Sequence, residues 1–140
     1  MKLKFCSLYS GSSGNCHYIK TENATIIVDA GLSGKKIQQE ISNIGEDPKK
    51  IDAIFITHEH TDHIQGAGIM SRRLNIPIYA NEKTWEAMSP CIGDVKSHNI
   101  KLLDDSTQIG DLVIKSFDIS HDSAQSGYFF LRACPISSSS

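Results

Sequence analysis

Three histidines, a glutamate and an aspartate occur within six positions, directly after an apolar run. The run IDAIFIT spans residues 51–57, and H-E-H-T-D-H follows it at residues 58–63. The run has the length and composition of a strand that is buried on both faces. Half of the six histidines of the chain lie in the polar segment. A buried strand that ends in imidazole and carboxylate groups is typical of a metal site at the edge of a sheet.

The spacing within this segment indicates how it could hold metal. Zinc is bound in proteins by neutral imidazole nitrogens and carboxylate oxygens, usually with four ligands. His58 and His60 are two positions apart, so an extended loop turns both side chains to the same side. Asp62 and His63 follow where the backbone should turn into a helix, and they can face a second point nearby. We therefore predict a dinuclear site, whose ions lie about 3.5–4 Å apart and activate a bridging hydroxide.

One ion needs more than two protein ligands. The best further candidate is His121, which lies in DISHDS, a polar loop directly after an apolar segment. His17 and His98 are weaker candidates, because a predicted hairpin contains the former and a polar stretch contains the latter. We predict that His121 completes a three-nitrogen site with His58 and His60. Asp62 and His63 would form half of a second site.

The rest of the chain predicts a mixed α/β domain. Isoleucines spaced by four and three residues predict a helix that begins after Ser33, and Asn81 is the expected N-cap of a short helix over residues 82–88. A further helix is expected over residues 63–74. Strands are predicted at residues 2–9, 16–20, 25–29, 51–57, 76–80, 99–105, 111–119 and 127–132, with a turn at 106–110. Strands and helices alternate first and strands dominate later, which favours one α/β (α+β) domain.

Composition excludes several classes of protein. The net charge of -2 and the scattered basic pairs give no general attraction to nucleic acid or to a membrane surface. No apolar stretch approaches the roughly 20 residues of a membrane helix, so no membrane partner is expected. Four cysteines lie far apart without a C-x-x-C pair, which argues against a disulfide scaffold and a zinc–thiolate site. We expect a cytoplasmic protein with reduced thiols.

A loop of small polar residues near the start allows two interpretations. Small residues let backbone amides and hydroxyl groups approach a phosphate beside the metals. Glycine-serine loops are also common as tight connections between strands. The loop consists of Ser10, Gly11, Ser12, Ser13, Gly14 and Asn15.

Several of these motifs resemble those of the metallo-β-lactamase superfamily. H-x-H-x-D-H after an apolar strand resembles the signature of that superfamily, and T-I-I-V-D-A-G at residues 25–31 resembles its first motif. F-D-I-S-H-D at residues 117–122 resembles the segment that supplies a third histidine. S-G-S-S-G-N and H-E-H-T-D-H-I-x-G are similar to the YycJ/WalJ-type hydrolases, a group associated with 5′-to-3′ DNA exonuclease activity. The likeness runs from residue 1 to about residue 131.

The resemblance implies a fold and a set of roles. It implies the N-terminal half of an αββα sandwich over residues 1–131, with one mixed sheet and helices on its outer face, and a divergent tail over residues 132–140. Asp29 would support the metal loop by hydrogen bonding, and Asp62 would be a catalytic ligand that holds and orients the hydroxide. The complete site of the family holds two divalent ions, for which zinc suits the ligands and manganese or iron are alternatives. No candidate for the remaining ligands follows residue 122, so about one ion is expected in this chain, which would then be truncated or frame-shifted.

Three functions are compatible with this pattern. The first is metal-dependent hydrolysis of a DNA phosphodiester by a metal-activated hydroxide. The second is hydrolysis of a small-molecule ester, thioester, lactone or cyclic nucleotide, since a fold does not determine a substrate. The third is a non-catalytic fragment that binds at most one metal. Half of a sandwich should also leave the inner face of its sheet uncovered, with apolar residues of the segments 25–29, 52–56 and 111–117 on it. An uncovered apolar face of this kind predicts self-association.

Overall fold

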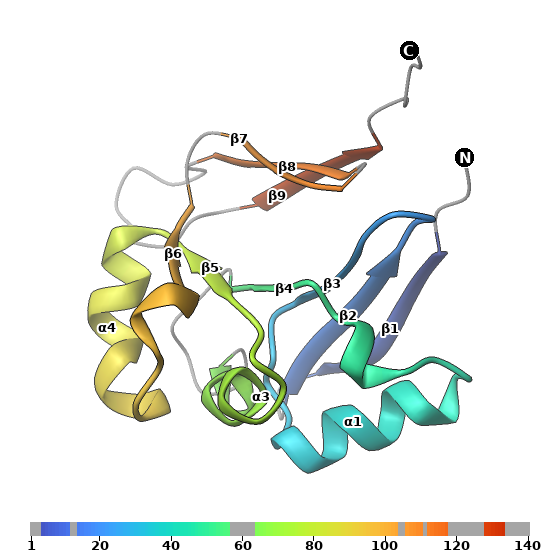
Figure 1. The fold of residues 1–140 in the computed structure, drawn as a ribbon, viewed down its shortest axis with the longest axis horizontal. Coiled ribbons are helices and arrows are strands. Elements are labelled where there is room, and N and C mark those ends of the chain that lie inside the picture. Colours follow the sequence, from blue (N-terminus) through green and yellow to red (C-terminus); the bar gives the residue numbers. More distant parts are fainter. Residues whose placement is uncertain are drawn as a thin grey trace.

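The chain forms two β-sheets, and helices cover the outer face of the larger one (Figure 1). The structure is a computed structural model that describes residues 4–11, 14–56, 64–103, 106–110, 112–117 and 128–133. The larger sheet contains β1 (Lys4–Gly11), β2 (Gly14–Lys20), β3 (Thr25–Val28), β4 (Ala53–Phe55), β5 (Ile78–Ala80) and β6 (Ile100–Leu102). The smaller sheet contains β7 (Ser106–Ile109), β8 (Leu112–Phe117) and β9 (Tyr128–Ala133).

The strand order of the larger sheet brings the ends of several strands to the same side of the sheet. The order is β1-β2-β3-β4-β5-β6, with antiparallel pairing from β1 to β3 and parallel pairing from β3 to β6. The strands β3, β4 and β5 therefore all end at the same edge, which we call the carboxyl edge. Because β2 is antiparallel to β3, the turn between β1 and β2 also lies there. The opposite edge, where β3 and β4 begin, is the amino edge.

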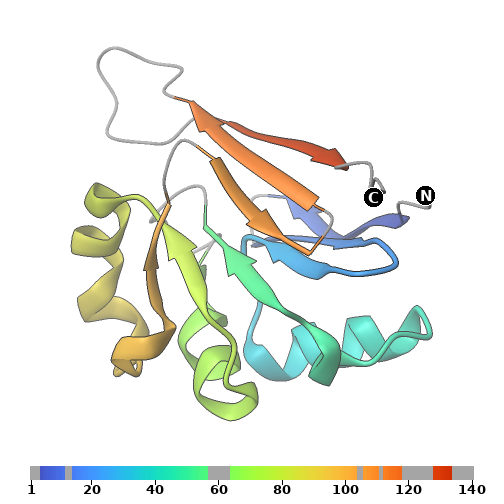
Figure 2. The ribbon, with the colours of Figure 1, turned by 45° about the horizontal axis from the view of Figure 1, so that its top comes forward.

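The smaller sheet changes one expectation. The prediction of a mixed sheet with helices on its outer face is confirmed, but the centre of its inner face is not bare. In Figure 2 the sheet β7-β8-β9 lies over that face, and Leu112 and Ile114 of β8 are fully buried against Ile26 and Phe55. Residues 112–117 were expected to belong to the uncovered face, and they form part of its cover instead. Residues 106–109 form β7 rather than a turn, because the hairpin closes at residues 110–111.

Three helices pack a second core against the outer face. They are α1 (Gly34–Asn43), α3 (Ala67–Leu74) and α4 (Glu82–Ile92), and single turns of 3-10 helix span Pro48–Lys50 and Ser97–Asn99. The predicted N-caps are confirmed, since Ser33 accepts a hydrogen bond from Lys36 N and Asn81 accepts one from Thr84 N. The helix α4 runs four residues further than predicted, because Ile92 continues its buried stripe. No described helix is long and apolar enough to cross a membrane.

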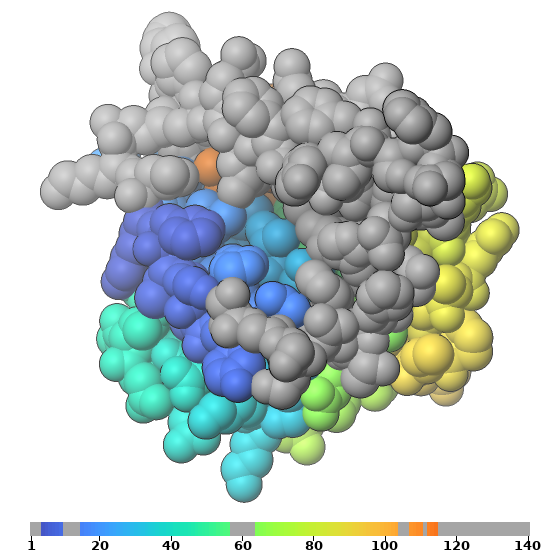
Figure 3. All heavy atoms as spheres, turned by 180° about the vertical axis from the view of Figure 1, so that it is seen from behind, coloured from blue at the N-terminus to red at the C-terminus, as the bar shows by residue number. Residues whose placement is uncertain are grey.

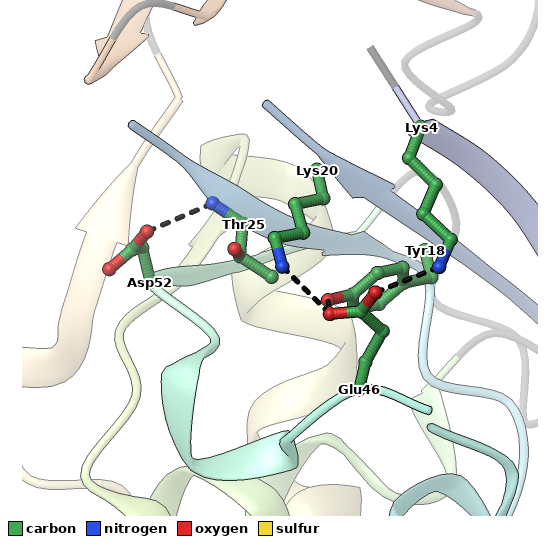
Figure 4. A network of polar contacts seen from close by, with 6 residues as sticks. All are labelled: Lys4, Tyr18, Lys20, Thr25, Glu46 and Asp52. Atoms are coloured by element: carbon green, nitrogen blue, oxygen red, sulfur yellow. Dashed lines mark hydrogen bonds and ion pairs between the residues drawn. The ribbon is translucent and has the colours of Figure 1, made fainter. Parts of the chain in front are cut away.

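Side chains pair closely at the amino edge (Figure 4). The carboxylate of Glu46 lies 2.8 Å from the ammonium groups of both Lys4 and Lys20, and it accepts a 3.3 Å hydrogen bond from the Tyr18 hydroxyl. The two lysine hydrogen bonds lower the pKa of Glu46 from 4.5 to about 2. Burial, followed by the charge of Glu46, raises the pKa of Tyr18 to about 12. This cluster joins the first two strands to the segment that follows α1.

Candidate metal centre

The side chains predicted to bind metal lie outside the described residues. This holds for His58, His60, Asp62, His63 and His121, and also for Ser12 and Ser13 of the serine-glycine loop. Within the described ranges, no group of three or more histidine, cysteine, aspartate or glutamate side chains could hold an ion. The metal ligands therefore stay predictions, and the structure describes the frame on either side of them.

The segment of residues 57–63, which we call the metal loop, starts and ends in well-packed structure. The residue before it, Ile56, is fully buried, and its amide donates a 3.0 Å hydrogen bond to the carbonyl of Tyr79 in β5. The residue after it, Ile64, is also buried and belongs to the core beneath the helices. Both ends of the metal loop are thus anchored at the carboxyl edge.

Three consecutive residues after β3 connect the parts of this edge, and we call them the brace. The Asp29 amide donates a 2.6 Å hydrogen bond to Phe55 O, two residues before the metal loop. Gly66, three residues after the loop, donates from its amide to Ala30 O at 2.7 Å. The Gly31 amide donates a 2.8 Å hydrogen bond to Asn15 O, in the hairpin. The backbone of residues 29–31 therefore contacts both flanks of the metal loop and the hairpin.

Asp29, the first residue of the brace, has an unusual backbone conformation. Its φ of 65° lies in the left-handed region, which few residues other than glycine adopt, aspartate and asparagine most readily. Its side chain is buried. The predicted supporting role of this carboxylate stays a prediction, because its proposed partners belong to the metal loop. The contact of its amide with β4 was not predicted from the sequence.

The serine-glycine loop is the tip of the β1–β2 hairpin. Ser10 pairs with Asn15 and Gly11 with Gly14, so only two residues lie between the paired ends. This geometry agrees with the interpretation as a tight connection. The second interpretation, a phosphate cradle, stays a prediction, and it is compatible with the position of the hairpin tip at the carboxyl edge.

The structure also describes three further potential ligands, Cys16, His17 and His98. Burial strongly raises the pKa of the Cys16 thiol, and the negative charge of Asp29 raises it further. The thiol is therefore held in its neutral form, whereas zinc binds the thiolate. The ring of His17 stacks on Phe5 with 5.8 Å between ring centroids. His98 precedes β6 at the amino edge and makes a 3.0 Å hydrogen bond with the Asn75 side chain.

Comparison with known proteins identifies the family. The family model of the metallo-β-lactamase superfamily matches residues 9–130. The chain is 45% identical over 134 residues to the exodeoxyribonuclease WalJ of Streptococcus pneumoniae strain D39, and 40% identical over 131 residues to the exodeoxyribonuclease YycJ of Bacillus anthracis. Each match covers 92% of this chain and 50% of the relative, so the chain spans about half the length of these relatives.

Solved structures agree on the fold. A class B3 di-zinc metallo-β-lactamase from an Alaskan soil metagenome superposes with a TM-score of 0.72 at 19% identity, over 89% of this chain and 55% of that one. A B3 metallo-β-lactamase with an active-site glutamic acid superposes equally well, at 20% identity over 89% of this chain and 53% of that chain. At this identity the likeness concerns the fold alone. Together with the family model, it shows that the chain belongs to the metallo-β-lactamase superfamily of metallo-hydrolases.

Proposed function

We propose that this chain provides the metal-binding part of a DNA exonuclease that acts from 5′ to 3′. The observation that carries the proposal is its identity of 45% and 40% to two exodeoxyribonucleases over 92% of its length. The superfamily implies divalent metal ions, commonly zinc. The chain spans half of the length of these relatives. The exonuclease activity is therefore our inference and does not follow from membership of the superfamily.

The donor groups of this chain fit such ions. Imidazole and carboxylate are ligands that zinc accepts, and the packed flanking residues Ile56 and Ile64 favour a position of the metal loop at one edge of the larger sheet. His58, His60 and His121 would hold the first ion, and two other side chains of the loop would contribute to the second. When bound, the ions lower the pKa of water to supply a nucleophile and polarise the bond under attack.

The direction of β8 supports the inclusion of His121. In Figure 2, β8 points the same way as β4 and β5, so β8 ends on the side of the carboxyl edge, four residues before His121. The same edge carries the hairpin tip, whose amides and hydroxyl groups would bind a phosphate of the DNA. Asp62 would orient the nucleophile beside the phosphate. The polar groups of substrate binding and chemistry would then share one edge of the sheet.

A chimaeric protein tests this function directly. Residues 1–131 joined to the second half of the pneumococcal WalJ should degrade 5′-phosphorylated single- or double-stranded DNA when zinc or manganese is added. The His58→Ala form of the same chimaera should be inactive, and the 140-residue chain alone should be poorly active, because it has few ligands for the second ion. RNA of the same sequence serves as the competing substrate.

Two outcomes would contradict the proposal. One is a folded chimaera that retains its metal but hydrolyses neither single-stranded nor double-stranded DNA. The other is equal turnover by the His58→Ala form, which would show that the activity does not depend on the metal loop. Preference for small esters or cyclic nucleotides over DNA would favour the alternative hydrolase function instead.

A further inference from the structure

We propose that Gly66 is a positioning residue for the metal loop, and that it acts by letting the brace of residues 29–31 pack onto the loop's C-terminal flank. This inference rests on the proposed function, because it assumes that the metal loop binds an ion. It concerns described residues, and its tests measure metal affinity and amide protection rather than hydrolysis.

The close approach of two backbones at Gly66 is the first observation. A Cβ atom at this position would clash with the carbonyl oxygen of Leu32 and would lie 3.0 Å from the amide nitrogen of Gly34. It would also lie 2.9 Å from Ile37 Cδ1. Backbone atoms cannot move aside as a flexible side chain can, so any larger residue must push the segment that follows β3 away from the start of α3.

The hydrogen bond at this contact is the second observation. The Gly66 amide donates to Ala30 O at 2.7 Å, while the neighbouring residues of the brace bind Phe55 and Asn15. A shift of the segment after β3 would therefore disturb hydrogen bonds on both flanks of the metal loop and at the hairpin. Ligand side chains must be held precisely for tight metal binding, and loss of their supporting contacts typically weakens affinity about tenfold to a hundredfold.

Gly68, which lies in α3 two residues after Gly66, provides a matched control. A Cβ atom there would clash with the carbonyl oxygen of Ile92 and would lie 3.1 Å from Arg72 Nη1. This clash is as severe as that at Gly66, but it faces the end of α4 and not the brace. The guanidinium of Arg72 donates hydrogen bonds to Ile92 O and Asp94 O at that contact. Both substitutions should lower stability, and only one should disturb the metal loop.

The experiment compares the zinc affinity of Gly66→Ala, Gly68→Ala and the unchanged 140-residue chain by competition with a chromophoric chelator. It is done at a temperature where circular dichroism shows all three folded without metal. Gly66→Ala should bind zinc about tenfold to a hundredfold more weakly, whereas Gly68→Ala should stay within about threefold of the unchanged chain. Similar affinities for the two variants, whether both weakened or both unchanged, would overturn the inference.

Amide hydrogen exchange of the unchanged chain gives a second test, which does not need Gly66→Ala to fold. Zinc should slow exchange of the Gly66 and Gly31 amides by about tenfold or more, since both belong to structure that the ion would hold together. The Thr21 amide, bonded to Ala24 O at 2.8 Å at the far end of β2, should change little. Equal effects at all three amides would overturn the inference. Absence of zinc binding by the unchanged chain would contradict the proposed metal site itself, and with it the role of Gly66.

Discussion

The two edges of the larger sheet are built in different ways. At the amino edge, side chains of opposite charge pair with one another around Glu46. At the carboxyl edge, backbone hydrogen bonds of the brace, residues 29–31, connect the hairpin and both flanks of the metal loop. The first arrangement satisfies its charges internally and contributes to stability. The second holds the backbone on either side of the residues that are predicted to bind an ion.

This difference suggests that the amino edge contributes to stability and the carboxyl edge to metal binding. Side chains that are already paired are poor ligands, because a metal or substrate would have to displace their partners. Backbone hydrogen bonds can position a loop without using any of its side chains. We expect substitutions at the amino edge to alter stability with little effect on metal binding, and substitutions at the carboxyl edge to weaken metal binding.

The largest expected effect comes from His58→Ala. Removal of one of three imidazole ligands should weaken zinc binding more than a hundredfold, while the metal-free chain keeps its unfolding temperature within a few degrees. Equilibrium dialysis with zinc and thermal unfolding by circular dichroism measure the two quantities. His98→Ala at the amino edge is the control and should bind zinc normally. Loss of binding in both variants would contradict the proposed ligand set.

The next largest effects concern the zinc stoichiometry and the pH dependence of the zinc affinity. The 140-residue chain should bind close to one zinc ion, because three histidines are available for one site and the second site has fewer ligands. Affinity should fall as the pH drops through the usual histidine range near 6.5, since a protonated imidazole cannot bind metal. Elemental analysis and chelator competition between pH 8 and 5.5 test both points. Two tightly held ions per monomeric chain would refute this expectation.

A smaller effect is expected for Glu46→Gln at the amino edge. The pKa of Glu46 is lowered from 4.5 to about 2 in the folded chain, so its charge stabilises the fold above about pH 4.5. That stabilisation is lost as the pH falls towards 2. The variant should be less stable by about 1 kcal/mol at pH 7, because the lysine partners are partly exposed to solvent.

Urea unfolding of Glu46→Gln at pH 7 and at pH 3 checks this prediction. The difference from the unchanged chain should shrink at the lower pH, and zinc affinity at pH 7 should stay the same. A large loss of zinc affinity would break the proposed division between the two edges. A constant difference in stability at both pH values would show that the charge of Glu46 is not responsible.

The smallest effect is expected for Asp52→Asn. The Asp52 carboxylate accepts a 2.9 Å hydrogen bond from the Thr25 amide at the start of β3, and Figure 4 shows this contact beside the Glu46 cluster. An asparagine oxygen can still accept that bond, so the loss should be about 0.5 kcal/mol or less. Urea unfolding measures it. A loss above that for Glu46→Gln would mean that the single hydrogen bond matters more than the ion pairs.

Figure 3 views the molecule from behind, where β1 and β2 reach the surface. Phe5 of β1, the outermost strand in the order of the larger sheet, is 60% exposed. The predicted self-association through an uncovered inner face now applies to a smaller area, because β7, β8 and β9 cover the centre of that face. It remains a prediction, and sedimentation of the purified chain would test it.

The family and the main helices and strands were predicted from the sequence alone. The helix caps at Ser33 and Asn81 were predicted correctly because capping is local and needs only a few neighbouring residues. The apolar run before the metal loop was identified as a buried strand for the same reason. The ligand roles of His58 and its neighbours, in contrast, stay predictions.

Contacts between distant residues were decided by the tertiary structure. No local pattern indicates that Lys20 pairs with Glu46, 26 positions away, that Gly66 packs on the segment after β3, or that β8 covers the larger sheet. Such contacts depend on strand order and on the path of the connections, and these emerge only when the whole core is assembled. The sequence determined which groups could do the chemistry, because residue types carry it, and the tertiary structure decided how the frame around them is held.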